Sequence, residues 1–186
     1  MANAGAMEAL LAARSYKKEV ILTTADGNHL EEFFNLILDF QDLEMEHTVV
    51  FMDTEESCQK AMSLMPNLGC TWASFLVDTH PEPYWTRIVH MWLMRWAIFN
   101  SMVRRGYNVL ILDTDNSVRM DPYIFLKSEM FGSYNQIVSF DEGIPEINCG
   151  AQYGQNISPD GPIAWITAEV VDRLLRCLSH SIFCQG

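Results

Sequence analysis

The sequence predicts an α/β fold in which a mostly parallel β-sheet carries helices on both faces. Short apolar runs alternate along the 186 residues with segments whose apolar residues recur at helical spacing, and there is no internal repeat. Almost every apolar run also ends at an aspartate. Strands that alternate with helices are typical of parallel sheets, because a helical crossover is needed between parallel strands.

The first half of the chain contains the clearest alternation. Residues 19–24 (EVILTT) form an apolar run that predicts a strand, and residues 29–43 carry apolar side chains at helical spacing. A second apolar run, HTVVFMD at 47–53, predicts the next strand. Residues 54–65 are expected to form a helix, because Thr54 is a suitable N-cap and a proline follows the last turn.

The second half continues the pattern. TWASFLVD at 71–78 predicts a third strand, and residues 85–105 predict a long helix whose Met and Trp side chains are interpreted as core. NVLIL at 108–112 and IVSF at 137–140 predict the fourth and fifth strands. Residues 167–178 are expected to form the last helix.

Composition limits the classes of function. Twelve Lys and Arg against 24 Asp and Glu give a formal net charge of −12, which repels a nucleic-acid backbone and excludes nucleic acid as a partner. A hydrophobic content of 49% excludes disorder and supports one packed core. No apolar run approaches the roughly 20 residues that span a bilayer, so no membrane segment is expected within the chain.

Residues 1–18 are expected to be an N-terminal helical or flexible segment before a domain at 19–186.

Cysteine usage indicates neither a metal site nor a disulfide framework. The count is odd and no pair forms a CxxC motif. The five cysteines are Cys58, Cys70, Cys149, Cys177 and Cys184.

Aspartates follow the predicted strands at a regular position. They are Asp26, Asp53, Asp78, Asp113 and Asp141. Because the carboxyl ends of parallel strands share one edge of the sheet, these carboxylates are expected to form an acidic rim where α/β sheets bind ligands. The alternative is that Asp is a common loop and N-cap residue. Such a rim would bind a sugar or a metal directly, and a phosphate through a divalent cation.

The motif LDTDNS is the most informative part of that rim. Asp113 and Asp115 follow a fully apolar strand, two residues apart. Two neighbouring carboxylates repel each other unless a cation lies between them, and their hard oxygens suit Mg²⁺ or Mn²⁺. The motif therefore predicts a metal site, with a solvated turn as the alternative.

Arg95 lies on the apolar side of the helix expected at 85–105. At 100° per residue its neighbours are large apolar side chains, among them Met91, Trp92 and Phe99. A buried guanidinium needs an anionic partner. That partner is either a substrate diphosphate or one of the rim aspartates, unless the side chain extends to solvent.

The stretch RRGYNVLILDTDNSVRMDPYIF resembles the nucleotide-diphospho-sugar transferase domain of plant and algal Golgi glycosyltransferases. Gly106-Tyr107, the Asp113-Thr114-Asp115 motif and Asp121-Pro122 keep the spacing of that family. VSFD at 138–141 and Asn148-Cys149-Gly150 resemble two further family motifs. The resemblance covers roughly residues 19–178.

This resemblance implies a Rossmann-like sheet of the A-type glycosyltransferase fold and transfer of a sugar from a UDP-sugar to a glycan or glycoprotein acceptor in the Golgi lumen. It implies Mn²⁺ (or Mg²⁺) as cofactor, held by Asp113 and Asp115, and mostly retention of anomeric configuration. Seven residues are implied to bind the nucleotide-sugar: Thr23, Thr24, Ala25, Arg95, Asp113, Asn148 and Gly150. Asp141 and Asn148 are implied to be the catalytic residues and to face the donor sugar or the acceptor.

Departures from the family keep two alternatives open. Asn116-Ser117-Val118 replaces bulky apolar residues, and the chain ends without a later Asp-Gln motif, so a domain shortened at its C-terminus is expected. A catalytically degenerate module that binds sugar or protein is one alternative. The other is a haloacid-dehalogenase-like phosphatase with Asp113 as nucleophile and Asp115 as acid/base, although Lys127 follows too soon for its usual lysine.

Overall fold

The computed structural model describes residues 4–27, 29–73, 83–140 and 147–179. A six-stranded sheet has the order β3-β2-β1-β4-β6-β5. The strands are β1 (Glu19–Ala25), β2 (Thr48–Met52), β3 (Gly69–Trp72), β4 (Asn108–Leu112), β5 (Gln136–Phe140) and β6 (Ile147–Gly154). β1 pairs in parallel with β2 and β4, and β2 pairs in parallel with β3. The predicted α/β class with a mostly parallel sheet is confirmed.

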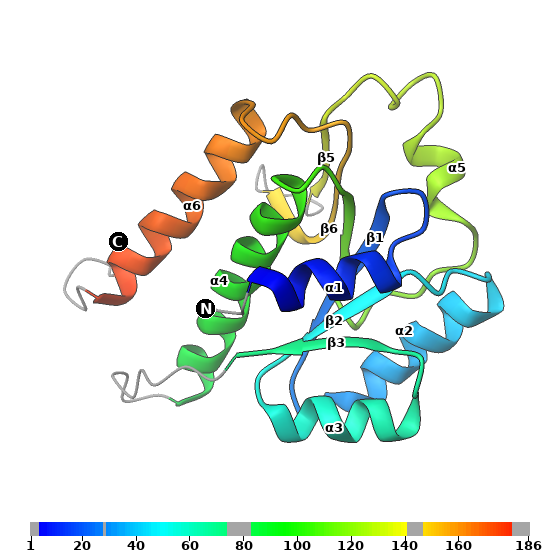
Figure 1. Cartoon of the computed structure of the whole chain (residues 1–186), viewed down its shortest axis with the longest axis vertical. Helices are drawn as coiled ribbons and strands as arrows, with labels where there is room; N and C mark the ends of the chain where they lie inside the picture. The colour runs from blue at the N-terminus through cyan, green and yellow to red at the C-terminus, as the bar shows by residue number, and fades with distance from the viewer. Residues whose placement is uncertain (1–3, 28, 74–82, 141–146, 180–186) are drawn as a thin grey trace.

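Helices cover both faces of this sheet (Figure 1). They are α1 (Ala4–Arg14), α2 (Leu30–Asp42), α3 (Glu55–Leu64), α4 (Pro83–Val103), α5 (Pro122–Leu126) and α6 (Pro162–Ser179). Side chains of α1, α4 and α6 pack against one face of the sheet, and those of α2 and α3 pack against the other. Among the described residues, no helix has the length and hydrophobicity to span a membrane.

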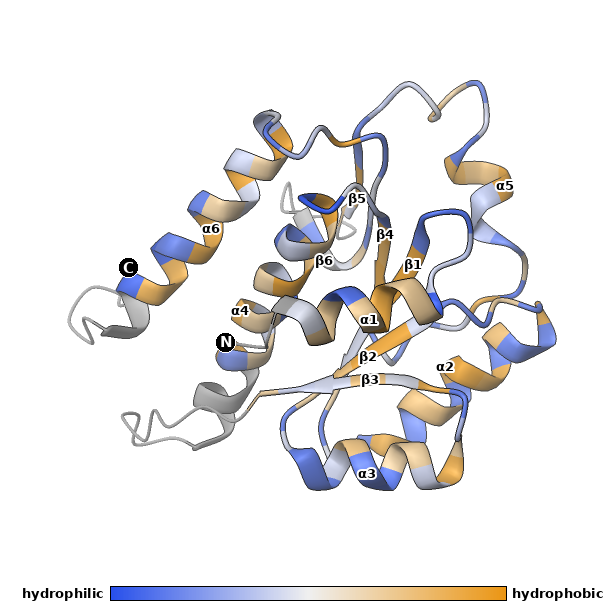
Figure 2. Ribbon diagram, in the orientation of Figure 1, coloured by the Kyte–Doolittle hydropathy of each residue, from blue (hydrophilic) through white to orange (hydrophobic). Residues whose placement is uncertain are grey.

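The core consists of two apolar layers separated by the sheet. Alternate residues of β1 enter opposite layers: Ile21 packs with Phe33 of α2, whereas Leu22 packs with Phe99 of α4. In Figure 2 the central strands are accordingly the most hydrophobic part of the ribbon, and α3 and α6 carry hydrophilic residues on their outer sides. This is the burial expected of parallel strands covered on both faces.

The sixth strand was not predicted. β6 lies between β4 and β5 and is antiparallel to both, so β4 and β5 run in the same direction and their carboxyl ends meet at the same edge. Its sequence, INCGAQYG, lacks the apolar run that marked the other strands. The predicted third strand is seen as β3, and its expected residues 74–78 lie outside the described residues. The last helix begins five residues earlier than expected, at Pro162.

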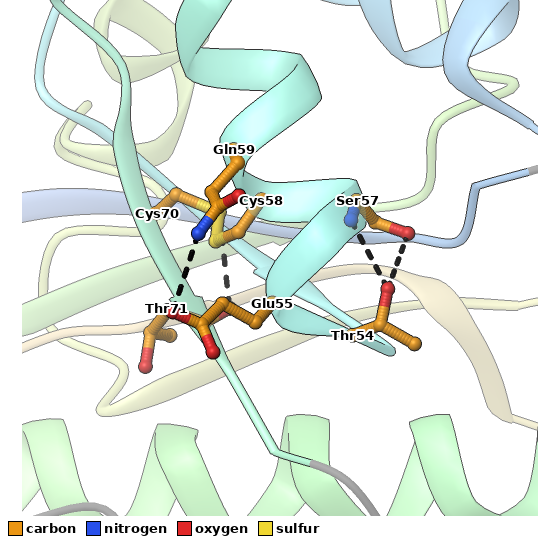
Figure 3. Close-up of a disulfide and its surroundings, with 7 residues drawn as sticks. All are labelled: Thr54, Glu55, Ser57, Cys58, Gln59, Cys70 and Thr71. Carbon is orange, nitrogen blue, oxygen red and sulfur yellow. Dashed lines mark hydrogen bonds between the residues drawn. A yellow bond between two sulfur atoms is a disulfide. The ribbon is translucent and has the colours of Figure 1, made fainter.

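Two cysteines form a disulfide, which corrects the expectation from their spacing. Cys58 of α3 and Cys70 of β3 are bonded, with their Cα atoms 5.9 Å apart (Figure 3). The bond lies beside the N-terminus of α3, where the Thr54 side chain accepts a hydrogen bond from the Ser57 backbone N–H at 3.0 Å, as predicted for an N-cap. The disulfide therefore ties the edge strand of the sheet to the helix that precedes it.

A buried carboxylate stabilises the edge of the sheet at which β1 and β4 begin, the amino edge. Glu19, at the start of β1, forms an ion pair with Lys127 and accepts hydrogen bonds from Asn108 Nδ2 at 2.6 Å and from Tyr153 Oη at 2.8 Å. Burial, and then the charge of Glu19, raise the pKa of Tyr153. The charge is compensated by a lysine and two hydrogen bonds, as a buried carboxylate requires.

Candidate functional site

A cleft of about 260 Å³ opens at the carboxyl ends of β1 and β4. β1 lies between β2 and β4, and the chain leaves it towards β2 before it returns on the other side as β4. This is the topological switch point, where open α/β sheets bind ligands. The lining comes from the ends of these two strands, from the start of α2 and from α4: Thr24, Ala25, Asp26, His29, Met91, Trp92, Arg95, Asp113, Thr114 and Asp115.

Arg95 and Asp113 form an ion pair at the base of the cleft. Arg95 is 2% exposed, as its place on the apolar side of the helix predicted, whereas the Asp113 side chain is 38% exposed. Of the partners that the sequence left open, the structure shows a rim aspartate. The guanidinium donates a hydrogen bond from Nη1 to Oδ1 of Asp113.

Asp115 differs from Asp113 in its surroundings, although the two belong to one motif. Asp115 is exposed at the rim of the cleft. On the β1 side, Asp26 accepts hydrogen bonds at its Oδ1 from the backbone N–H of His29 at 3.1 Å and contacts His29 Nδ1 at 2.8 Å. The cleft therefore carries three carboxylates and one buried guanidinium, a balance that favours a cation.

The start of β6 holds Asp113 in place. The backbone N–H of Asp113 donates to the Gly150 carbonyl at 2.8 Å, and the Gly150 N–H donates to Asn148 Oδ1 at 2.6 Å. A Cβ at position 150 would lie 2.8 Å from both Asn148 Oδ1 and Asp113 Oδ2. Only glycine lets these oxygens approach the backbone so closely. Asn116 Nδ2 adds a bond to the Asp113 carbonyl at 3.0 Å.

The loop after the motif is fixed to α2 by Asp39. Its Oδ2 accepts hydrogen bonds from the Val118 backbone N–H at 2.8 Å and from Ser117 Oγ at 2.9 Å. These bonds, the one from Val118 foremost, hold the pKa of Asp39 below its usual value. Ser117 and Val118, which depart from the family pattern, thus have a structural partner in this chain.

The flanking motifs also have local structural reasons. Gly106 follows α4 with φ +75°, the left-handed conformation in which glycine commonly ends a helix, and Tyr107 is buried. Asp121 caps α5 by accepting from the Tyr123 backbone N–H at 2.8 Å, and Pro122 occupies the first turn. These two motifs shape the entry and exit of the segment that carries Asp113 and Asp115.

The structure brings most of the predicted site residues together. Thr24, Ala25, Arg95, Asp113 and Asp115 line the cleft, Gly150 contacts Asp113, and Asn148 contacts Gly150. Thr23 is fully buried and is not part of the lining. Asp141 and Asp78 lie outside the described residues, and Asp53 follows β2 without lining the cleft.

His29 and Trp92 are among the cleft residues that the sequence analysis did not assign to the site. His29 had no distinguishing signal, since a lone histidine at a helix start is common. Trp92 was interpreted as core, but it is 47% exposed in the cleft, one helical turn before Arg95. An indole that is half exposed inside a concave site is the signal that only the folded chain provides.

Comparisons with known proteins support the fold. No family model matches the chain, and no curated protein matches its sequence. Among solved structures, the chain is similar to the crystal structure of the glycosyltransferase GlyE from Streptococcus pneumoniae TIGR4, with a TM-score of 0.52 and 12% sequence identity. The match covers 90% of this chain and 40% of that one, so the chain spans less than half the length of its structural relative. The chain therefore shares the fold of a glycosyltransferase domain.

Proposed function

We propose that the protein is a metal-dependent glycosyltransferase that uses a nucleotide-diphosphate sugar, a UDP-sugar in the first instance. The observation that carries this proposal is the paired carboxylates Asp113 and Asp115 in a cleft at the switch point of the sheet. A glycosyltransferase fold supports it. The acceptor would be a glycan or a glycoprotein, and retention of configuration is proposed from the family resemblance.

The donor set of the cleft fits a hard divalent cation, Mn²⁺ or Mg²⁺. Within the part of the chain that the structure describes, no three His, Cys, Asp or Glu side chains form a complete metal site. Asp115 is exposed. Arg95 binds Oδ1 of Asp113, which leaves Oδ2 of that carboxylate for the cation. Two carboxylates with open positions left for phosphate and water are the usual set for Mg²⁺. When bound, the cation would supply positive charge that stabilises the diphosphate leaving group.

The chain's own residues would orient the donor. Arg95 binds Oδ1 of Asp113, and Gly150 lies against Oδ2 of the same carboxylate and accepts the Asp113 backbone N–H. Thr24 and Ala25 would line the nucleoside pocket. Asn148 and Asp141 are proposed to face the sugar or the acceptor. In this proposal Arg95 and Gly150 fix Asp113, and Asp115 binds the cation.

The disulfide supports a proposed location in the secretory pathway, the Golgi lumen. Disulfides persist in oxidising compartments and are rare in the cytosol. Cys58 is 3% exposed, which shields the bond between Cys58 and Cys70 on one side.

The site favours this function over a phosphatase. A phosphatase would require Asp113 as a free nucleophile, but the buried guanidinium of Arg95 is paired with it. None of the described residues that line the cleft is a lysine, and Lys127 is engaged with Glu19 at the amino edge of the sheet.

Donor turnover tests the proposal and separates an enzyme from a degenerate binding module. A panel of UDP-sugars is incubated with the protein and Mn²⁺, and release of UDP is measured with and without glycan acceptors. We expect metal-dependent release with at least one donor, lost in Asp115→Ala and kept in Asp160→Ala, whose exposed carboxylate lies outside the cleft lining. Binding of a donor without any release would support the degenerate module instead.

A further inference from the structure

Trp92 is an exposed aromatic side chain in an otherwise acidic cleft. It projects from α4, and its exposed fraction of 47% contrasts with the buried Leu93 beside it and with Trp96, which packs edge-on against Phe99 at 5.8 Å between ring centroids. Large apolar side chains that remain exposed in a concave site are typical of ligand contacts. The position of Trp92 therefore indicates a ligand group that can stack on the face of an indole.

The rest of the cleft defines which group that is. Asp26, Asp113 and Asp115 repel anions, and they account for a cation and the diphosphate that it would carry. A diphosphate gains nothing from an indole. A planar heteroaromatic ring does, because it stacks on an aromatic face without needing a charge. Trp92 lies one turn from Arg95 on the same helix, and Arg95 is paired with Asp113. The indole is therefore next to the carboxylates that are proposed to hold the cation and its diphosphate.

We propose that Trp92 is the stacking platform for the nucleobase of the donor. This inference rests on the proposed function, and it adds the element that selects a nucleotide over other diphosphates. Thr24 and Ala25, at the end of β1, form the small-residue wall of the same cleft. The base lies against Trp92, and the diphosphate points towards Asp115. Binding of the nucleotide thus combines an apolar contact with the cation-mediated contact.

Calorimetry with two probes tests this assignment. UDP and inorganic pyrophosphate are each titrated in the presence of Mn²⁺, because only UDP carries the base. Trp92→Ala is expected to weaken UDP binding roughly 5- to 150-fold, the range that base–aromatic stacking gives, and to leave pyrophosphate binding unchanged. Trp92→Phe keeps an aromatic face and is expected to retain UDP affinity within about threefold.

Two controls make the outcome specific. Trp165→Ala removes an indole that is 65% exposed on α6, outside the cleft, and should leave UDP affinity unchanged. Thermal unfolding of each variant verifies that the fold is intact, and Trp92→Leu, which removes the aromatic ring but keeps an apolar side chain, serves if Trp92→Ala does not fold.

Four outcomes would overturn the inference. Equal UDP affinity in Trp92→Ala and the wild type would remove Trp92 from the donor site while the proposed function stands. Equal losses for UDP and pyrophosphate would make the effect structural. A loss for a UDP-sugar but not for UDP would assign the indole to the sugar ring. Absence of Mn²⁺-dependent UDP binding in the wild type would refute the proposed function itself, and the assignment with it.

Discussion

Removal of Asp113 should damage the fold more than removal of Asp115, although both belong to one motif. Asp113→Ala leaves the guanidinium of Arg95, which is 2% exposed, without its partner. Breaking a buried ion pair from one side costs about 3–5 kcal/mol of unfolding free energy. Asp115 is exposed, and Asp115→Ala should change that free energy by no more than about 0.5 kcal/mol.

Variants of Arg95 separate the cost of an unpaired buried charge from the cost of lost packing. Arg95→Met leaves a carboxylate that is 38% exposed and can be solvated. The free energy of unfolding of this variant should therefore lie within about 1–2 kcal/mol of the wild-type value. The double variant Arg95→Met with Asp113→Ala should recover most of the loss, because no buried charge remains. For a chain of this size, the Asp113→Ala cost corresponds to a fall of roughly 6–20 °C in melting temperature.

Urea unfolding, followed by circular dichroism, measures these differences directly. The four proteins and the wild type are compared at one pH and ionic strength. Equal stability of the Asp113→Ala and Asp115→Ala variants would refute the reasoning, as would an Asp113→Ala cost that the second substitution at Arg95 does not reduce.

Three further predictions concern the rest of the fold. Glu19→Ala removes the acceptor of three donors at the amino edge and should cost roughly 3–5 kcal/mol in urea unfolding, whereas a cost below about 1 kcal/mol would show that the network is dispensable. Reduction of the bond between Cys58 and Cys70, which closes a loop of sequence separation 12, should cost about 2–4 kcal/mol, and the double serine variant should show no further effect of reductant in thermal unfolding. Burial lowers the pKa of His47 from 6.5, so the unfolded chain binds the proton more tightly; stability should be complete above pH 6.5 and fall as pH decreases below it, and His47→Phe should flatten that slope in urea titrations.

Periodicity predicted the elements that are buried on a regular pattern and missed those fixed by tertiary pairing. The apolar runs of β1, β2 and β4 are buried on both faces, and a helix with Arg95 on its apolar side was correctly expected. β6 was missed because Gly150 and Gln152 interrupt the pattern, and its place between β4 and β5 depends on pairing with strands distant in sequence.

The same reason explains what the sequence could not show of the site. Asp113 and Asp115 were recognised from their motif, but their different roles follow from contacts with Arg95 and Gly150. Helical spacing assigned Trp92 to the core, since it cannot show that this part of α4 passes the ends of the strands, where a cleft opens. The spacing of Cys58 and Cys70 likewise carried no information on the packing of α3 against β3.

Calorimetric titration of UDP in the presence and absence of Mn²⁺ tests the central claim most directly. If the protein is a nucleotide-sugar transferase with Asp115 as a metal ligand, UDP binding should require Mn²⁺, disappear in Asp115→Ala and persist in Asp160→Ala. Binding that is independent of metal, or absent from the wild-type protein, would contradict it.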